Sequence, residues 1–281
     1  MDFDQIRTYL EVIETGSFVA AAEVLNVTQS TVSARIKELE YRLGQSLFIR
    51  RKSGVVLTTA GRRFQPHAAT LMHVLQQARH DVALSPETRA LISVGGQYSL
   101  WERILQPWLG QIRQTLPDVA VRAEVGTPES LMRHLSEGLL DFAVMYSPEA
   151  RPGFDLEVLL EETVILVATK PRHRGPVAKD YVFVDWGPDF EIWHAGMFPS
   201  FSAPEVRVSL GTLGLKHILA HGGAGYFTES LAAPHLKTKE LHRVRSAPTF
   251  VRPAHIIYPT DTDAPGIGEA LELLRDLAED A

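Results

Sequence analysis

The sequence predicts a protein of two parts, an α+β part at the N-terminus and a larger α/β part at the C-terminus, joined by a long helix. Apolar residues recur at helical spacing through most of the first 84 residues, interrupted by one pair of short strands. Residues 59–84 keep an apolar residue at steps of three and four. From residue 90 onward, short apolar runs alternate with helical segments, which is typical of a parallel sheet covered by helices.

The composition excludes several classes of protein. The 281 residues suit two or three globular units, and 45% hydrophobic with 22% charged residues is typical of a chain that folds throughout. The absence of cysteine excludes disulfides, thiolate metal sites and thiol nucleophiles. The acidic start lacks the features of a signal peptide, and no apolar run approaches the roughly 18 residues of a membrane span. We therefore expect a cytoplasmic protein.

Positive charge is concentrated near the N-terminus, although the net charge of the chain is −6. Residues 1–84 carry ten Lys or Arg against eight Asp or Glu, so the remainder of the chain carries a net charge of −8. Within them, residues 35–63 hold eight cationic side chains and two carboxylates. A local excess of this kind indicates a surface that contacts nucleic-acid phosphates.

Three helices are predicted in the first 44 residues. The first begins near Phe3 and ends at Gly16, Ser17 caps a short second helix, and Thr28 caps the third. The third helix buries one apolar stripe, which consists of Val32, Ile36, Leu39 and Leu43. Its opposite face is small and polar, so it could enter a major groove. The candidates for DNA contact on this helix are Gln29, Ser30, Thr31, Ser33, Ala34 and Lys37.

Residues 47–58 predict two short strands around a basic turn. Three consecutive cations, Arg50, Arg51 and Lys52, lie at the tip of this hairpin. Such a tip suits contact with the DNA backbone or the minor groove better than base readout. Residues 1–58 are therefore predicted to form a winged helix-turn-helix DNA-binding domain.

A linker and dimerisation helix with a hinge is predicted over residues 59–88. Its seam consists of Phe64, Ala68, Leu71, Leu75, Ala78 and Val82. The heptad spacing favours pairing with a second copy of the chain, but the same residues would suit a helix packed on its own domain. A dimer would present two recognition helices to an inverted repeat in promoter or operator DNA.

The first sixty residues resemble the signature of the LysR family of transcriptional regulators. The resemblance is carried without gaps by residues 4–12, Gly16 to Phe18, Ala22, Thr28 to Ser33, Ile36, Leu39, Glu40, Leu43, Gly44, Leu47, Phe48 and Leu57 to Gly61. It implies transcription regulation by a homodimer or homotetramer that binds double-stranded DNA and a small-molecule effector. One departure is Ala34, where family members frequently carry Arg. The neighbouring Arg35 lies beside the apolar stripe, where contact with phosphate or extension along the surface is expected rather than guanine readout.

Residues 89–281 predict an effector-binding regulatory domain of two Rossmann-like lobes, similar to periplasmic binding proteins. Lobe I takes about 89–161 and 260–281, and lobe II about 162–259. The expected strands are 90–95, 119–125, 140–146, 163–169, 181–185, 205–210, 225–227 and 251–258, and the expected helices are 100–115, 127–138, 212–221 and a last one from 265. The run from Trp186 to Phe190 resembles a branch of the family that includes repressors of flagellar genes.

Effector-binding candidates follow from the strand ends, where ligands of such folds bind. They are Gly96, Gln97, Tyr98, Ser99, Trp101, Thr127, Pro128, Tyr146, Trp186, Gly187 and Thr228. Ser99 and Thr127 would equally serve as plain helix caps, and the two tryptophans as core residues.

No catalytic motif or cofactor motif is recognised, so neither an enzyme, nor a cofactor, nor a metal is predicted. The sequence contains no dinucleotide fingerprint, Walker motif or nucleophile elbow. His217 and His221 stand four residues apart on one predicted helix, but no third metal ligand is placed by spacing. Two alternatives stay open: a regulator without a small-molecule effector, and a two-lobed solute-binding protein or enzyme.

Overall fold

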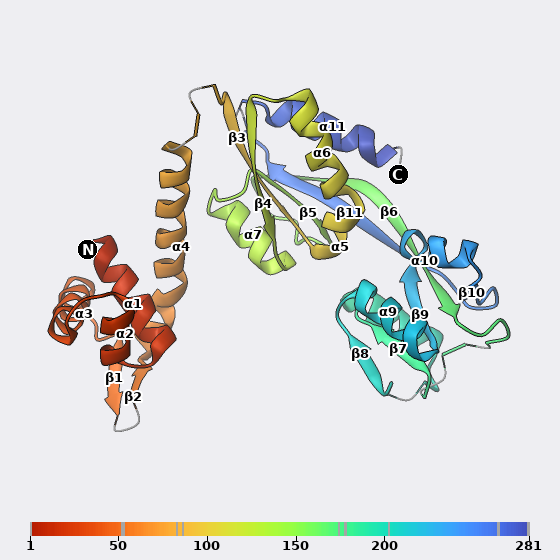
Figure 1. Ribbon diagram of the computed structural model, residues 1–281, viewed down its shortest axis with the longest axis horizontal. Helices are drawn as coiled ribbons and strands as arrows, with labels where there is room; N and C mark the ends of the chain where they lie inside the picture. The colour runs from red at the N-terminus through yellow and green to blue at the C-terminus, as the bar shows by residue number, and fades with distance from the viewer. Residues whose placement is uncertain are drawn as a thin grey trace. The chain divides into compact units, whose positions relative to one another are not determined.

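The computed structural model describes residues 2–51, 54–82, 84–85, 87–173, 175–176, 179–201, 203–262 and 265–279. The chain divides into two compact units, Met1–Pro86 and Glu87–Ala281 (Figure 1). Among the described residues, no helix is both long and apolar enough to cross a bilayer.

The N-terminal unit consists of three helices, a hairpin and a long fourth helix (Figure 1). In chain order these are α1 (Phe3–Thr15), α2 (Phe18–Val24), α3 (Gln29–Leu43), β1 (Phe48–Arg51), β2 (Gly54–Leu57) and α4 (Thr59–Val82). The three predicted caps are present: Gly16 ends α1 at φ 65°, and the hydroxyls of Ser17 and Thr28 accept from first-turn amides of α2 and α3. Local sequence therefore sets the boundaries of all three helices.

The core of the N-terminal unit forms around Tyr9. Its buried ring lies 5.3 Å from the ring of Phe48 and 5.2 Å from that of Phe64. The Tyr9 hydroxyl donates to the carbonyl of Gly61 at 2.7 Å, which joins α1 to α4. A Cβ at position 61 would lie 2.3 Å from the carbonyl oxygen of Leu47, so only glycine allows α4 to approach the segment before β1 this closely.

The seam of α4 divides into two parts. Ala68 is fully buried in the core of its own unit, with Phe64 and Leu71 packed against the same core. Further along the helix, Val82 is 88% exposed, and Ala78 is also exposed. The first half of the helix therefore packs on its own domain, and the second half leaves apolar side chains uncovered. Pairing of this second half with a second copy of the chain stays a prediction.

The C-terminal unit is built on one continuous sheet. Its first half contains β3 (Ala90–Gly96), α5 (Tyr98–Leu100), a π-helical turn η1 (Trp101–Leu105), α6 (Gln106–Thr115), β4 (Val119–Val125), α7 (Pro128–Ser136), β5 (Phe142–Tyr146) and β6 (Phe154–Ala168). Its second half contains β7 (Tyr181–Val184), α8 (Pro188–Met197), β8 (Val206–Val208), α9 (Gly211–His221), β9 (Ala224–Thr228), α10 (Glu229–Lys237), β10 (His242–Arg243), β11 (Phe250–Pro259) and α11 (Ile267–Glu279).

The strand order is β4-β3-β5-β11-β6-β9-β7-β8, with β10 paired to β6. β4, β3 and β5 are parallel, and so are β9, β7 and β8. β11 and β6 lie between these groups and pair antiparallel with each other and with their outer neighbours. Two parallel lobes are thus joined by a pair of long crossing strands (Figure 1).

Each lobe has its own apolar core. In lobe I, α6 and α11 bury Trp108, Ile112 and Leu274 against one face of the sheet, and α7 buries Leu131 and Leu135 with a second cluster that includes β5. In lobe II, β7, β9 and part of β6 pack with α8, α9 and α10. This two-lobed arrangement confirms the predicted fold class.

Three sequence predictions for this unit were wrong. The predicted helix 100–115 begins earlier, at Tyr98, so Ser99 lies within its first turn and Gln97 occupies the N-cap position. The predicted strand 163–169 covers only the second half of β6. The first half of β6 was missed because it is half-exposed and rich in carboxylates. α8 and α10 were not predicted, since α8 shows no clear apolar stripe and α10 contains Pro234.

Candidate functional site

The predicted recognition helix α3 presents a polar, accessible face. Its buried residues are Val32, Ile36 and Leu39, as the periodicity predicts. Of the proposed contact residues, Gln29, Ser30, Ala34 and Lys37 are exposed, and Thr31 and Ser33 are half-buried. The Thr28 hydroxyl hydrogen-bonds with those of Ser30 and Thr31, both at 2.8 Å, which orders the first turn of the helix.

Arg35 does not point to the groove-facing side of α3. Its Nη2 lies 2.6 Å from Oδ2 of Asp4, and its Nη1 donates to the Thr8 hydroxyl at 3.4 Å. The side chain is 26% exposed. The expected contact with phosphate is thus replaced by an ion pair that joins α3 to α1.

The β1–β2 hairpin, which is the predicted wing, is anchored to the helices by hydrogen bonds at its backbone. The carboxylate of Glu40 accepts from the amides of Leu47 and Phe48 at 2.7 and 3.2 Å, and the amide of Val55 donates to the carbonyl of Gly16 at 3.1 Å. β1 and β2 pair antiparallel from Phe48↔Leu57 to Arg51↔Gly54. The predicted cation Lys52 and the side chains of Arg50 and Arg51 lie outside the described residues.

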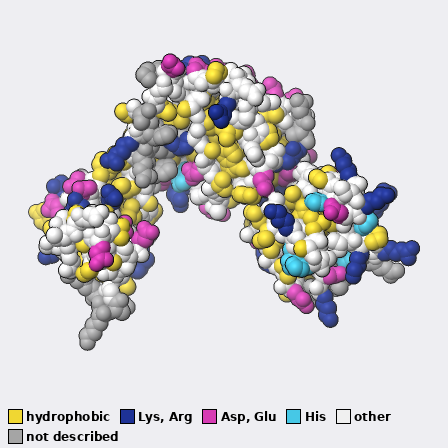
Figure 2. All heavy atoms as spheres, viewed as in Figure 1, with side chains coloured by type: hydrophobic (Ala, Val, Ile, Leu, Met, Phe, Trp, Pro, Cys, Tyr) yellow, Lys and Arg dark blue, Asp and Glu magenta, His cyan; other side chains and the backbone are white. Residues whose placement is uncertain are grey.

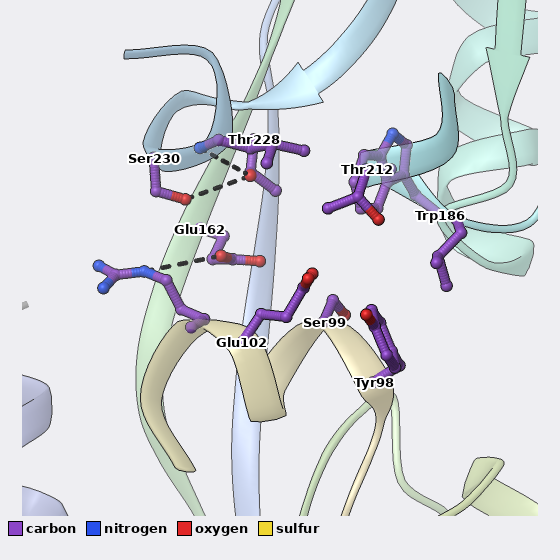
Figure 3. Close-up of a pocket in the computed structure, with 12 residues that line it drawn as sticks. Tyr98, Ser99, Glu102, Glu162, Trp186, Thr212, Thr228 and Ser230 are labelled. Carbon is purple, nitrogen blue, oxygen red and sulfur yellow. Dashed lines mark hydrogen bonds and ion pairs between the residues drawn. The ribbon is translucent and has the colours of Figure 1, made fainter. Parts of the chain in front are cut away.

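A cavity of about 260 Å³ lies where the two lobes of the C-terminal unit meet (Figure 3). Lobe I contributes α5 and the π-helical turn, lobe II contributes the starts of α9 and α10, and β6 crosses between them. The lining residues are Tyr98, Ser99, Glu102, Arg103, Glu162, Trp186, Leu210, Gly211, Thr212, Thr228, Ser230 and Leu231. The lining therefore combines hydroxyls, two carboxylates, a guanidinium and apolar side chains, which suits a small polar ligand.

The carboxylate of Glu162 is the most buried charge of the lining. It is 7% exposed, accepts a short hydrogen bond from the Tyr146 hydroxyl, and lies 3.8 Å from Nε of Arg103. Burial, and secondarily the charge of Glu162, raise the pKa of Tyr146. The tyrosine is thus a neutral donor that holds the carboxylate in place.

Arg252 lies opposite Glu162 in the register of β11 and β6. Its guanidinium carbon is 3.3 Å from the centre of the Tyr146 ring and 5.3 Å from the Trp186 ring. Burial lowers the pKa of Arg252, whereas Tyr146, Glu162 and Asp185 raise it. Cation–π contacts and the nearby carboxylate therefore offset part of the cost of burying this charge.

Only part of the predicted effector set lines the cavity. The residues that do so are Tyr98, Ser99, Trp186 and Thr228. The other predicted residues, Gly96, Gln97, Trp101, Thr127, Pro128, Tyr146 and Gly187, are not among the lining residues. Several of these have structural roles: the Gln97 side chain accepts from the Tyr146 amide at 2.7 Å, the Trp101 indole donates to the Glu124 carbonyl at 2.9 Å, and Thr127 caps α7.

Sequence reasoning missed the remaining lining residues. Leu210 to Thr212 precede and open α9, whose start was predicted, so the rule that ligands bind at helix N-termini could have found them. Ser230 and Leu231 lie on α10, which was not predicted. Glu102 and Arg103 lie on the π-helical turn, and Glu162 lies inside β6, so no strand end marks them.

The described residues contain no group of three or more His, Asp or Glu side chains arranged to hold a metal ion. The rings of His217 and His221 are 4.9 Å apart on α9, at the edge of a separate hollow. Acidic and basic side chains are mixed over the visible face of the C-terminal unit in Figure 2. That face therefore offers no continuous basic track of the kind that follows a nucleic-acid backbone.

A helix-turn-helix with a wing, followed by a long helix and a two-lobed unit with a cavity between its lobes, defines a class of transcription regulator. Comparison with known families agrees. The protein-family model described as bacterial regulatory helix-turn-helix protein, lysR family, matches residues 3–62. The family model described as LysR substrate binding domain matches residues 85–279. The chain belongs to the LysR family: it is a DNA-binding transcriptional regulator with an effector-binding domain, which confirms the resemblance found in the sequence.

Individual relatives support this placement. The HTH-type transcriptional regulator HdfR from Salmonella newport, and that from Salmonella typhimurium, are each 32% identical over 266 residues, 94% of either chain. Among solved structures, full-length CbnR complexed with its target DNA has a TM-score of 0.77 at 20% identity and covers 99% of this chain and 100% of its own. ArgP from Mycobacterium tuberculosis has a TM-score of 0.58 at 28% identity, with 99% and 97% covered.

Proposed function

We propose that the chain binds operator DNA as a homodimer, or as a tetramer built from such dimers, and that a small molecule in the cavity between the lobes changes this binding. The exposed polar face of α3 carries the first part of the proposal, because it leaves small polar side chains and one cation, Lys37, free to enter a major groove. Solved relatives support it: CbnR and Vibrio fischeri DarR have been crystallised with DNA, and LysG from Corynebacterium glutamicum with bound effector Arg.

The domain boundaries follow from the same proposal. Residues 1–58 bind DNA, residues 59–88 link and dimerise, and residues 89–281 sense the effector. The lobes take 89–161 with 260–281 and 162–259, and β6 and β11 pass through both. In the DNA-binding domain, the residues that meet the major groove are Gln29, Ser30, Thr31, Ser33, Ala34 and Lys37. Arg50, Arg51 and Lys52 meet the phosphate backbone.

The dimer forms through the uncovered second half of α4. Leu75, Ala78 and Val82 continue the heptad seam past the point where it packs on its own unit. Two recognition helices related by a two-fold axis then address an inverted repeat, and binding becomes bivalent. An effector changes DNA binding only through a difference in affinity for two arrangements of the subunits.

The wing provides the test of the DNA interface. We expect the double charge reversal Arg50→Glu with Arg51→Glu to weaken binding to specific and random DNA alike, because phosphate contacts carry no sequence information. The plot of log affinity against log salt should become less steep, by about two for each altered wing. The reason is that each lost phosphate contact removes about one released counterion. Gel-shift titrations of the full chain at several salt concentrations measure both quantities.

Arg243→Glu with Arg245→Glu, a matched reversal in lobe II, should leave the affinity and the salt slope unchanged. An unchanged slope in the wing variant would remove the wing from the interface. If the unaltered chain binds no genomic fragment more tightly than random DNA, the proposed function itself is wrong.

A further inference from the structure

The cavity between the lobes contains one carboxylate that the protein does not itself neutralise. Glu162 receives the Tyr146 hydroxyl and lies near Arg103, with Arg252 close behind. Glu102, by contrast, is exposed and makes no hydrogen bond or ion pair with any described residue. Figure 3 shows its carboxylate directed into the open space between Glu162 and Thr212. A ligand in this space therefore meets a free negative charge.

The backbone turns Glu102 and Arg103 toward the same space. Both lie on the π-helical turn, where the amide of Gln106 reaches back to the carbonyl of Trp101. A π-helical turn is wider than an α-helical turn, so consecutive residues diverge less around the axis, and such turns recur at functional sites. Arg103 approaches Glu162, which leaves Glu102 as the charge that faces the ligand.

The rest of the lining limits the size and character of the ligand. Hydroxyls of Ser99, Thr212, Thr228 and Ser230 surround the carboxylates, and Leu210 and Leu231 supply apolar surface. A volume of about 260 Å³ limits the ligand to a small molecule. An unpaired carboxylate that faces this cavity favours a cationic group and disfavours a second anion.

We propose that the effector is a small molecule with a protonated amino group, and that Glu102 binds this group. The inference rests on the proposed function of the cavity as the effector site. It adds the chemical class of the ligand and names Glu102 as the residue that selects it. The hydroxyls then hold the uncharged part of the molecule.

The test compares five small probes that differ in charge on the full chain: butylamine, 4-aminobutanoate, N-butylacetamide, butanoate and succinate. We expect the two amine-bearing probes to raise the melting temperature and to give measurable heats in calorimetric titration, and the other three to do neither. Glu102→Gln should weaken amine binding by about tenfold or more, since it removes the charge but keeps the shape. Glu102→Lys should transfer binding to butanoate.

The matched control is Glu272→Gln on α11, which removes an exposed charge away from the cavity and should leave amine binding unchanged. Binding of carboxylates alone, binding of no probe, or amine binding that survives Glu102→Gln would each overturn the inference. Gel-shift titrations with the same protein separate the two proposals: retained DNA binding without amine binding contradicts only this inference, and amine binding without DNA binding contradicts only the proposed DNA function.

Discussion

Ser33 is a small hydrogen-bonding residue of α3 with which base edges could be read. It is half-buried beside exposed Ala34, and a serine hydroxyl can pair with any base edge. With Arg35 held by Asp4, little charge is left on this face, so selectivity has to come from short polar side chains and from the shape and spacing of the half-sites. With Ala34 at this position, sequence selectivity depends less on base readout and more on the shape and spacing of the DNA half-sites.

We expect Ser33→Ala to alter sequence preference more than overall affinity. Loss of one base contact costs about 1–3 kcal/mol against the specific site, which is roughly 5- to 150-fold in affinity, whereas binding to random DNA should be unchanged. Competition titrations with specific and random fragments measure the ratio. Ser136→Ala on α7 is the control, and an equal loss on both kinds of DNA would contradict a base-reading role.

His194 makes the stability of lobe II depend on pH. The imidazole is 3% exposed, hydrogen-bonds through Nε2 with the Tyr181 hydroxyl at 2.9 Å, and is surrounded by aromatic rings. Burial lowers its pKa to about 4. Because the unfolded chain binds the proton more readily, the full stability is present above the unfolded pKa of about 6.5 and is lost as the pH falls toward 4.

Between pH 7.5 and pH 5 this group should therefore remove about 2 kcal/mol from the free energy of unfolding. Urea unfolding at several pH values measures the loss. His194→Gln, which keeps a partner for Tyr181, should flatten the dependence, and His67→Gln at an exposed position should not. Equal pH slopes in His194→Gln and the unaltered chain would exclude His194 as the cause.

At the scale of elements, predictions succeeded where local chemistry decides and failed where tertiary contacts decide. Ser17, Thr28 and Gly16 mark helix ends through their own caps, so α1 to α3 could be found from sequence. The first half of β6 is a strand because β11 pairs with it from Phe154 to Leu160, and its sequence shows no clean alternation. The π-helical turn has no recognised sequence signal, and Glu102 was missed for that reason.

The two halves of α4 predict different effects of mutation. We expect Leu75→Glu with Val82→Glu to abolish the dimer, because charges replace apolar groups in the seam, while the unit itself stays folded. Sedimentation velocity gives the oligomeric state, and circular dichroism gives the fold. Ala69→Glu lies on another face of the helix and should remain dimeric. A dimeric double variant would place the subunit contact elsewhere.

At the scale of the whole molecule, the candidate cavity could be predicted only in outline. The ends of β3 and β9 pointed to Ser99 and Thr228, because parallel strands end at one edge of a sheet. Glu162 could not be found in this way, since it lies within a crossing strand and reaches the cavity only when both lobes are in place. The register between β6 and β11 is a long-range property that no local pattern specifies.

The division into two units predicts that the C-terminal unit folds alone. Residues 87–281 contain the complete sheet and the cores of both lobes, so this fragment should unfold in one cooperative transition and keep any affinity of the cavity for small molecules. Thermal unfolding and calorimetric titration of the fragment check both points, and gel shifts should show no specific DNA binding. A fragment without a cooperative transition would show that the units depend on each other.

The place of β11 in the sheet also has a consequence during synthesis. This strand lies between β5 and β6 but is made about a hundred residues after β5, which corresponds to roughly 5 to 20 s on the ribosome. Until then β5 has an unpaired edge that other chains could join. The N-terminal unit contains none of these strands and can complete its core first. In a nascent chain the DNA-binding unit can therefore be folded while the sheet of the C-terminal unit is still incomplete.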